Sequence, residues 1–311
     1  MIDKGKVHCF PFVFMLFFIY LWRWPMELRD NIKGVQHLGI PVCKMEETKR
    51  FYIENFGFEV IHEKEIFYPE KMRICFLKLG DLVVELFEHK NEAVRKEVES
   101  RVTGVYDHFA IDAADFDDYA AKLINKGLTL AAGTAEGVVL YENIKSKGIR
   151  GVNFVSPNGD VVEICYDNAR SYAGKSGLLG WDHLAVRTKD LKETMSFYAG
   201  LGFSMTGNGY LDTPDGRLYI AFMTCKGFTL ELIQLVGAAV DDPATWKSGK
   251  IDHISLDVQN VQDAFMEARS KGYEMLDFGI KELPLFEHGC RFFTIKGPNG
   301  EKIEFNQINK F

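Results

Sequence analysis

The chain is sparing with cysteine, and its cysteines are not grouped in any metal or redox motif. Six residues of this type stand singly, with no Cys-x-x-Cys pair, at Cys9, Cys43, Cys75, Cys165, Cys225 and Cys290. This arrangement argues against a thiolate zinc site and against a disulfide framework. We therefore expect reduced, mostly buried thiols in a cytoplasmic protein.

An excess of positive charge is also missing. Lys and Arg number 37 against 44 Asp and Glu, which gives a net charge of −7 and a pI of about 5.7. A nucleic-acid partner is therefore not expected, because binding phosphates requires a basic face. The apolar share of 47% and the length of 311 residues instead suit a globular protein of two domains.

Several common catalytic motifs are absent. The sequence has no Gly-rich phosphate-binding loop, no Gly-x-Ser-x-Gly elbow and no clear Cys/His nucleophile pattern. The chemistry must therefore come from other residues.

Long apolar runs are absent except near the start of the chain, where residues 9–22 are almost wholly apolar. As a helix these residues span roughly 21 Å, less than the roughly 30 Å hydrocarbon core of a bilayer. Three interpretations are open: a weak membrane anchor, a signal-like segment, or an upstream stretch before a working start at Met26. We favour the last and assign residues 1–30 to an N-terminal extension outside the mature fold. A membrane partner is not expected.

The sequence does contain one short motif, a polar residue followed by His and an apolar residue, which occurs four times at a near-constant interval. Its histidines are His37, His108, His183 and His253. Each is followed, well before the next copy begins, by a glutamate in an apolar, strand-like run, at Glu85, Glu163, Glu231 and Glu304. The interval is longer than the repeats of solenoids and propellers, which indicates four small supersecondary units.

Each unit is predicted to contain a strand, a helix and three further strands. Units one and three share a Phe-Tyr pair and a Gly-Phe stop, and units two and four share a Pro-Asn-Gly turn before the glutamate. The order is therefore A-B-A-B, with a linker-like seam at residues 167–180. The sequence predicts an α+β fold of four βαβββ modules in two tandem domains, 34–168 and 180–309.

The repeated His and Glu residues predict a metal site. A carboxylate aimed at an apolar surface is costly to bury unless a cation meets it. Two facing units would bring together two His and two Glu, with room for water, which suits a catalytic divalent metal such as Zn, Ni, Co, Mn or Fe, up to two per chain. The alternative is a structural His at the start of a strand and a Glu on a solvent face.

Other recurring residues have weaker signals. One arginine stands at the start of the third predicted strand of each unit, at Arg73, Arg150, Arg217 and Arg291. These residues could bind a carboxylate or phosphate of a substrate, or simply occupy solvated strand ends. The Phe51-Tyr52 and Phe197-Tyr198 pairs are predicted to be helix core. The other histidines, His8, His62, His89 and His288, receive no role.

These features together resemble the vicinal oxygen chelate superfamily, which includes glyoxalase I, methylmalonyl-CoA epimerase, extradiol dioxygenases and metal-free resistance proteins. The resemblance covers residues 34–309. It rests on His37-Leu38-Gly39-Ile40, Glu85 in its strand, Asp107-His108, and Pro157-Asn158-Gly159 before Glu163, all repeated in the second half.

The resemblance implies two metal-dependent, glyoxalase I-like sites. Their ligands would be His37, Glu85, His108 and Glu163 and, in the copy, His183, Glu231, His253 and Glu304. Glu163 and Glu304 would act as the bases that move a proton alpha to a metal-polarised carbonyl of a small alpha-hydroxycarbonyl or thiohemiacetal substrate.

Two departures argue against a strict glyoxalase I assignment. Arg187 matches a glutathione-contacting arginine of that family, but Pro41 stands at the equivalent place in the first half. The Asn expected four residues after the strand Glu is His89 in one half and Leu235 in the other. An extradiol-type iron dioxygenase and a metal-free small-molecule binding protein are the alternatives. Whether modules pair within or across the halves, and whether the protein is a monomer or a homodimer, stays open.

Overall fold

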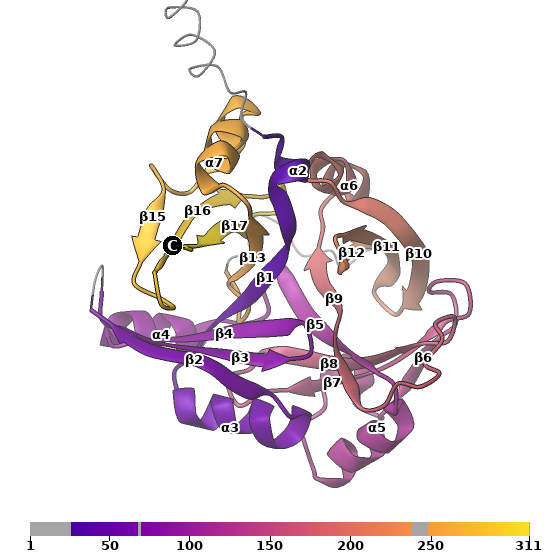
Figure 1. Ribbon diagram of the computed structural model, residues 1–311. Coiled ribbons are helices and arrows are strands. Elements are labelled where there is room, and N and C mark those ends of the chain that lie inside the picture. The colour runs from indigo at the N-terminus through magenta and orange to yellow at the C-terminus, as the bar shows by residue number, and fades with distance from the viewer. Residues whose placement is uncertain (1–25, 68–69, 238–247, 311) are drawn as a thin grey trace, which may run out of the picture.

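The computed structural model describes residues 26–67, 70–237 and 248–310, and its ribbon is shown in Figure 1. The fold is the mixed α+β arrangement of βαβββ modules that the sequence predicts. The strands form two large curved sheets, and the module helices α3, α5, α6 and α7 lie around the outside of the molecule (Figure 1).

The first half of the chain forms modules 1 and 2, joined by one helix. Module 1 contains β1 (Ile32–Pro41), α3 (Met45–Phe56), β2 (Glu59–Ile66), β3 (Met72–Leu79) and β4 (Leu82–His89). The joining helix is α4 (Glu92–Ser100). Module 2 contains β5 (Tyr106–Ala113), α5 (Phe116–Asn125), a 3-10 turn (Ala132–Thr134), β6 (Val139–Tyr141), β7 (Ile149–Val155) and β8 (Val161–Asp167).

The second half repeats this plan. Module 3 contains β9 (Leu178–Arg187), α6 (Leu191–Gly200), β10 (Ser204–Thr213), β11 (Gly216–Cys225) and β12 (Phe228–Val236). Module 4 contains β13 (His253–Val258), α7 (Val261–Ser270), β14 (Glu274–Met275), β15 (Lys281–Leu283), β16 (Cys290–Lys296) and β17 (Lys302–Ile308).

The local signals used to place these elements have a clear physical basis. Gly57 ends α3 in the left-handed conformation with φ of 77°, which a glycine adopts without a Cβ penalty. The Asn-Gly turns before β8 and β17 likewise place Gly159 and Gly300 at φ of 92° and 94°. Turn chemistry in the sequence therefore fixes where these elements stop.

The two sheets are assembled across the halves of the chain. One sheet has the order β14-β16-β17-β13-β1-β4-β3-β2, with β15 pairing to β16, and so joins module 4 to module 1. The other has the order β10-β11-β12-β9-β5-β8-β7-β6 and joins module 3 to module 2. Antiparallel pairs β1·β13 and β5·β9 form the two junctions. Segments 34–168 and 180–309 thus each contribute one module to each sheet, which settles the pairing that the sequence leaves open.

Hydrogen bonds between buried side chains connect the modules in the other direction, within each half. Tyr52 of α3 donates its hydroxyl hydrogen to Asp160, beside the Pro-Asn-Gly turn of module 2. Tyr198 of α6 donates to Oε1 of Glu301 at 3.1 Å, beside the equivalent turn of module 4. Both tyrosines are at most 1% exposed, and Phe51 and Phe197 are partly buried against the core. The Phe-Tyr pairs therefore pack into the core, as predicted.

The apolar core is continuous between the modules. Its largest cluster draws buried side chains from all four of them, including Phe109, Phe154, Leu232 and Phe305. Five cysteines lie in the described residues; all five are free, and four of them are buried, as the sequence predicts. Cys9 lies outside the described residues.

The short helix α2 (Leu28–Asn31) precedes the first module and packs against α7. Leu28 is fully buried, and the backbone oxygen of Asp30 accepts a hydrogen bond from Gln259. Residues 28–30, assigned from the sequence to an extension outside the mature fold, are therefore part of the fold. Residues 1–25 lie outside the described part of the chain. None of the helices among the described residues has the length and apolar character needed to span a bilayer.

Candidate metal centres

Each repeated histidine and glutamate lies on one of two neighbouring strands. The histidines are on the first strand of each module and the glutamates are on the last strand, and in all four modules these two strands pair in parallel. Side chains that share a face of adjacent strands come close together. The βαβββ topology therefore brings each module's His beside its own Glu.

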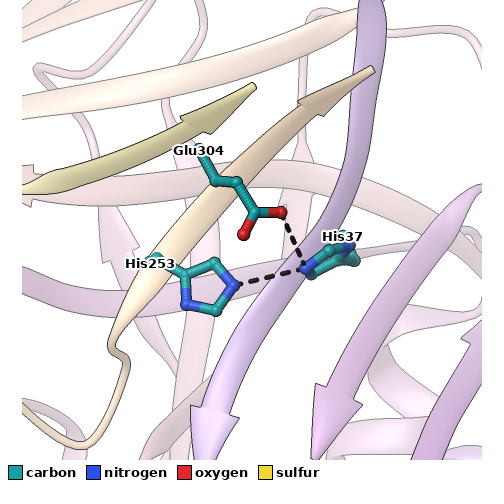
Figure 2. A group of neighbouring side chains, drawn as sticks. All are labelled: His37, His253 and Glu304. Atoms are coloured by element: carbon teal, nitrogen blue, oxygen red, sulfur yellow. Dashed lines mark hydrogen bonds and ion pairs between the residues drawn. The ribbon is translucent and has the colours of Figure 1, made fainter. Parts of the chain in front are cut away.

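The junction between modules 1 and 4 brings two such pairs together in what we call centre I: His37, Glu85, His253 and Glu304. The two Nε2 atoms of His37 and His253 are 3.2 Å apart. Oε2 of Glu85 lies 3.3 Å from the Nε2 of His37 and 3.5 Å from that of His253. Oε1 of Glu304 is 3.8 Å from His37 Nε2. Figure 2 shows the two rings and the Glu304 carboxylate converging from three strands.

The junction between modules 2 and 3 forms an equivalent cluster, centre II: His108, Glu163, His183 and Glu231. Its two Nε2 atoms are also 3.2 Å apart. Glu163 Oε2 lies 3.3 Å from both of them. Glu231 Oε2 lies 3.7 Å from His108 and 3.4 Å from His183.

The structure brings together all eight residues, but it groups them differently from the sets implied by the family resemblance. The expected set containing His37 and Glu85 also held His108 and Glu163, and the copy held the remaining four. The cause is the strand pairing described above, since β1 lies beside β13 and β5 lies beside β9. Each centre therefore takes two ligands from each half of the chain.

Both clusters have the chemistry and spacing of a divalent cation site. Ligands bound at about 2.0–2.2 Å in tetrahedral or octahedral geometry lie roughly 3–3.5 Å from each other. The closest contacts in the two centres, from 3.2 to 3.5 Å, fall in that range. Two imidazoles with two carboxylates suit Zn, Ni, Co, Mn or Fe. The residues present therefore fit the metal that the sequence predicts.

The residue before each histidine fixes the orientation of its ring. Nδ1 of His108 donates to Asp107 at 2.9 Å, and Nδ1 of His183 donates to Asp182 at 2.8 Å. In centre I the acceptor for His253 is Asp252, at 3.3 Å, and the acceptor for His37 is the amide oxygen of Gln36, at 3.1 Å. In the neutral ring with Nδ1 protonated, the form that binds a metal, the Nε2 lone pair faces the cluster.

Charge within the clusters is balanced between imidazoles and carboxylates. Burial opposes ionisation of Glu85, but the His37 and His253 rings more than offset this and lower the pKa of Glu85 to about 2. Burial likewise opposes ionisation of Glu163, and hydrogen bonds from His108 and His183 lower the pKa of Glu163 to about 2. Burial raises the pKa of Glu231. The clusters thus hold at least one firmly ionised carboxylate each.

The pKa values of the histidines shift upward, opposite to those of Glu85 and Glu163. Burial works against the charged form of His183, yet Glu231, Asp182 and Glu163 raise the pKa of His183 to about 9. Asp252 and Glu85 similarly overcome burial and raise the pKa of His253 to about 10. Protons on these rings take the place that a cation would occupy in balancing the carboxylates.

The two centres differ in how one glutamate is held. In centre I, Oε1 of Glu304 accepts hydrogen bonds from Ser255 Oγ at 2.8 Å and from Asn306 Nδ2 at 2.9 Å. The strand positions equivalent to these donors in centre II are Ala110 and Cys165, as the pairing of β5 and β8 shows. Glu304 is therefore supported independently of the imidazoles.

Two glycines allow the ligands to approach the strands closely. A Cβ on Gly39 would lie 2.1 Å from Cε1 of His253, and a Cβ on Gly151 would lie 1.9 Å from Oε1 of Glu163. Real Cβ atoms do not approach other atoms so closely. Both ligands thus depend on the absence of a neighbouring side chain.

Each centre forms part of the wall of a cavity. Cavity I has a volume of about 780 Å³ and includes His37, Glu85, His253 and Glu304 in its lining. Cavity II has a volume of about 590 Å³ and includes His108, Glu163 and Glu231. Both volumes lie within the roughly 300–1,000 Å³ of small-molecule sites. The clusters are thus reachable by a small molecule.

Most of the arginines predicted to bind substrate form ion pairs outside the two cavities. Arg187 lines cavity II. The other four lie outside both cavity linings, and each forms an ion pair with a nearby carboxylate: Arg73 with Glu46 and Glu63, Arg150 with Asp117, Arg217 with Asp212, and Arg291 with Glu282. Because these guanidinium groups are engaged at strand ends, we do not carry the substrate role forward for them.

Sequence reasoning missed the residues that support the ligands. Asp107, Asp182 and Asp252 stand inside the repeated motif itself, so the recurrence of Asp before His was the available signal. Ser255 and Asn306 carry no such signal, because they have no polar counterparts in module 2. His89 and Phe286 contribute to cavity I although neither lies in a repeated motif.

Comparison with known proteins agrees with this architecture. The family described as Glyoxalase/Bleomycin resistance protein/Dioxygenase superfamily matches residues 34–139 and 180–305. Mitochondrial methylmalonyl-CoA epimerase of Mus musculus is 26% identical over 189 residues, which are 58% of this chain and 97% of that protein. The uncharacterized protein YwbC of Bacillus subtilis (strain 168) is 30% identical over 127 residues, which are 40% of this chain and 95% of its own length.

Solved structures share the fold over most of the chain. Glyoxalase I from Zea mays superposes with a TM-score of 0.62 at 19% identity and covers 88% of this chain and 92% of its own. A point variant of the same enzyme gives a TM-score of 0.64 at 19% identity, with 90% and 94% coverage. At this identity the likeness establishes the fold and leaves the chemistry to be argued from the two centres.

Proposed function

Because the chain belongs to the Glyoxalase/Bleomycin resistance protein/Dioxygenase superfamily, we propose that it is a divalent-metal-dependent lyase or isomerase with two centres. The reaction would transfer a proton alpha to a carbonyl of a small alpha-hydroxycarbonyl or thiohemiacetal substrate. The observation that carries this proposal is that each junction brings two His and two Glu together beside a cavity. All four residues of centre I line cavity I, and His108, Glu163 and Glu231 of centre II line cavity II.

The residues that would hold the metal are the four of each centre. When bound, a divalent cation supplies a Lewis acid that polarises a substrate carbonyl and offsets the negative charge that develops on its oxygen. Aspartates behind His108, His183 and His253, and Gln36 behind His37, orient each ring so that Nε2 is directed at its cluster. The protein's own part is therefore to fix the geometry and to move the proton.

Glu304 is the base that we propose for centre I. Its Oε1 is held by Ser255 and Asn306 and lies farther from His37 than Glu85 does, at 3.8 Å against 3.3 Å. A carboxylate supported in this way can face a substrate C–H, accept its proton and return it to the neighbouring carbon.

In centre II the resemblance assigns the base to Glu163. Glu163 lies 3.3 Å from both imidazoles, whereas Glu231 is the more distant carboxylate and has the raised pKa. The E163Q and E231Q variants distinguish the two roles. Loss of proton transfer with the metal retained identifies the base, and loss of the metal identifies a ligand.

The first experiment measures metal in the purified protein. We expect up to two divalent ions per chain, with one lost in His37→Ala and the other lost in His183→Ala, because these residues belong to different centres. The double variant should hold none. Unchanged metal content in both single variants would remove the site assignment.

The second experiment follows the proton. Deuterium from solvent should enter the alpha position of alpha-hydroxycarbonyl compounds or thiohemiacetals in the presence of the protein, as monitored by NMR. E304Q is made in a chain whose centre II is disabled by His183→Ala. It should abolish this exchange, while centre I keeps its metal through His37, Glu85 and His253. Oxygen uptake with a catechol would instead support the dioxygenase alternative, and stoichiometric ligand binding without turnover would support a binding protein.

A further inference from the structure

The two cavities can be compared position by position, because strand pairing defines their equivalences. Phe76 pairs with Glu85 across β3 and β4, and Phe222 pairs with Glu231 across β11 and β12. Both rings contact a histidine of their centre edge-on, with centroids 5.4 Å from His37 and 5.9 Å from His183. The frameworks around the two centres are thus matched, and differences in the lining are meaningful.

Two equivalent strand positions are aromatic in cavity I and not in cavity II. Phe87 stands two residues after Glu85, where Ile233 stands after Glu231. Phe292 pairs with Asn306, two residues after Glu304, and Gly151 pairs with Cys165, two residues after Glu163. Phe87 and Phe292 line cavity I, and the ring of Phe87 is 5.9 Å from that of His253.

A third difference lies in the loops that precede β7 and β16. Phe286 stands three residues before Gly289, and Lys145 stands three residues before Gly148. Both have positive φ, 58° and 56°, so the two loops share one backbone shape at this position. Phe286 lines cavity I, while Lys145 turns to an ion pair with Asp167 at 3.1 Å.

Phe286 is held in place by other rings. It stacks on His62 with centroids 4.9 Å apart and lies 5.0 Å from Phe76. Its backbone N–H donates to Nε2 of His62 at 3.2 Å. His62 pairs with Phe76, and the equivalent residue, which pairs with Phe222, is Gly207. Cavity II therefore has no ring at this position to stack on the loop residue. A strained backbone held by its surroundings commonly marks a functional position.

We propose that centre I accepts substrates with an aryl group on the carbon next to the metal-binding oxygens, and that centre II accepts substrates with an aliphatic group there. The inference rests on the proposed function, since it concerns what is held beside the metal ligands. Phe87, Phe286 and Phe292 present ring surface to cavity I, where edge-on or offset contacts with a substrate ring are favourable. In cavity II the same positions are Ile233, the ion-paired Lys145 and Gly151. Tyr141, which lies beside Gly151, is the aromatic residue in the lining of cavity II.

The test uses two probes with the same pair of oxygens, benzohydroxamate and acetohydroxamate, which differ in a phenyl against a methyl group. Each is titrated into cobalt-loaded protein and followed by the visible absorption of the metal. His183→Ala leaves centre I to be measured, and His37→Ala leaves centre II. Centre I should prefer the phenyl probe by about tenfold more than centre II does, a ratio that a few ring contacts supply.

A matched pair of variants tests whether the phenyl preference of centre I comes from the cavity lining. Phe292→Leu, in the His183→Ala background, should weaken benzohydroxamate binding several-fold and leave cobalt content and acetohydroxamate binding unchanged. Phe278→Leu makes the same chemical change at a fully exposed residue of module 4. It should leave cobalt content and the binding of both probes unchanged. Equal phenyl preference in both centres, or a preference that Phe292→Leu does not reduce, would overturn this inference alone. Absence of bound cobalt from both centres would overturn the proposed function as well.

Discussion

At the scale of single residues, the two centres are built by charge complementarity and by close approach. Four buried glutamates are tolerated because each lies beside imidazoles that can carry a proton or direct a lone pair at a metal. Glycine at two strand positions leaves room for a ligand that any side chain would displace. Both features lead to measurable effects.

Metal binding should release protons. With the pKa of His183 raised to about 9 and that of His253 raised to about 10, both rings are protonated at pH 7 in the metal-free protein. The metal requires the neutral ring, so its apparent affinity should rise as pH rises toward 9–10 and should fall as the pH drops. Calorimetric titration with Zn²⁺ at pH 7 in buffers of different ionisation enthalpy measures the release. A binding enthalpy that is the same in every buffer would contradict it.

Gly39→Ala should lower metal affinity at centre I. The new Cβ would overlap the His253 ring, which must move away from His37 and Glu85. By analogy with disturbed supporting contacts, we expect a loss of roughly 10–100-fold. Competition with a chromophoric chelator reports the two affinities separately.

Gly279→Ala is the matched control, since no atom lies within 4 Å of the position its Cβ would take. It should leave both affinities unchanged. If Gly39→Ala also leaves both unchanged, the close approach of His253 to the strand is not required for binding.

At the scale of elements, buried tyrosine–carboxylate pairs tie each A module to the B module of its own half. Asp160 accepts hydrogen bonds from Tyr52, from Ser156 Oγ at 2.7 Å and from Asn158 Nδ2 at 3.1 Å. The Pro-Asn-Gly turn is therefore both a hairpin signal and a docking point for a helix. The sheets join modules across the halves, and these contacts join modules within them.

Tyr52→Phe and Tyr198→Phe should each destabilise the protein. Removing the hydroxyl leaves a buried carboxylate short of a donor, which costs about 1–3 kcal/mol. Urea unfolding of the metal-loaded protein measures the change. Metal content should stay at the wild-type level, because neither tyrosine contacts a centre.

The exposed Tyr219 provides the comparison, since it is 43% accessible. Tyr219→Phe should change the free energy of unfolding by less than about 0.5 kcal/mol. Equal effects at all three tyrosines would show that the buried pairs add no particular stability.

At the scale of the whole molecule, the halves of the chain are interlocked. Each centre takes one His and one Glu from each half, across the junctions β1·β13 and β5·β9. The seam between the halves is the short segment after β8 and before β9, and its Arg170 forms ion pairs with Asp112 and Asp182. Neither half contains a complete centre.

Cutting the seam should therefore not separate the halves. A protease site placed between Gly174 and Gly177 in the full chain should yield two fragments that co-elute in size-exclusion chromatography and keep both metals. Addition of urea should release fragments and metals together, because the same strand junctions hold both. Fragments that elute separately under native conditions, each with one metal, would contradict the cross-half assembly.

The sequence by itself determined the modules and the residues that meet in the two clusters. Its four His and four Glu, its Gly and Asn-Gly turns and its helix-core Tyr residues are local signals. The βαβββ order and all eight members of the two clusters could therefore be predicted from them. These signals depend on backbone conformation and side-chain type within a single module.

Only the tertiary structure decided which modules share a sheet and what surrounds each centre. His37 meets His253 across 216 positions of sequence, and Phe286 meets His62 across 224. A His and Glu pair is equally compatible with any partner module, because every module presents its first strand at the edge with its last strand beside it. The choice follows from the strand junctions of the folded chain, and with it come the different linings of the two cavities.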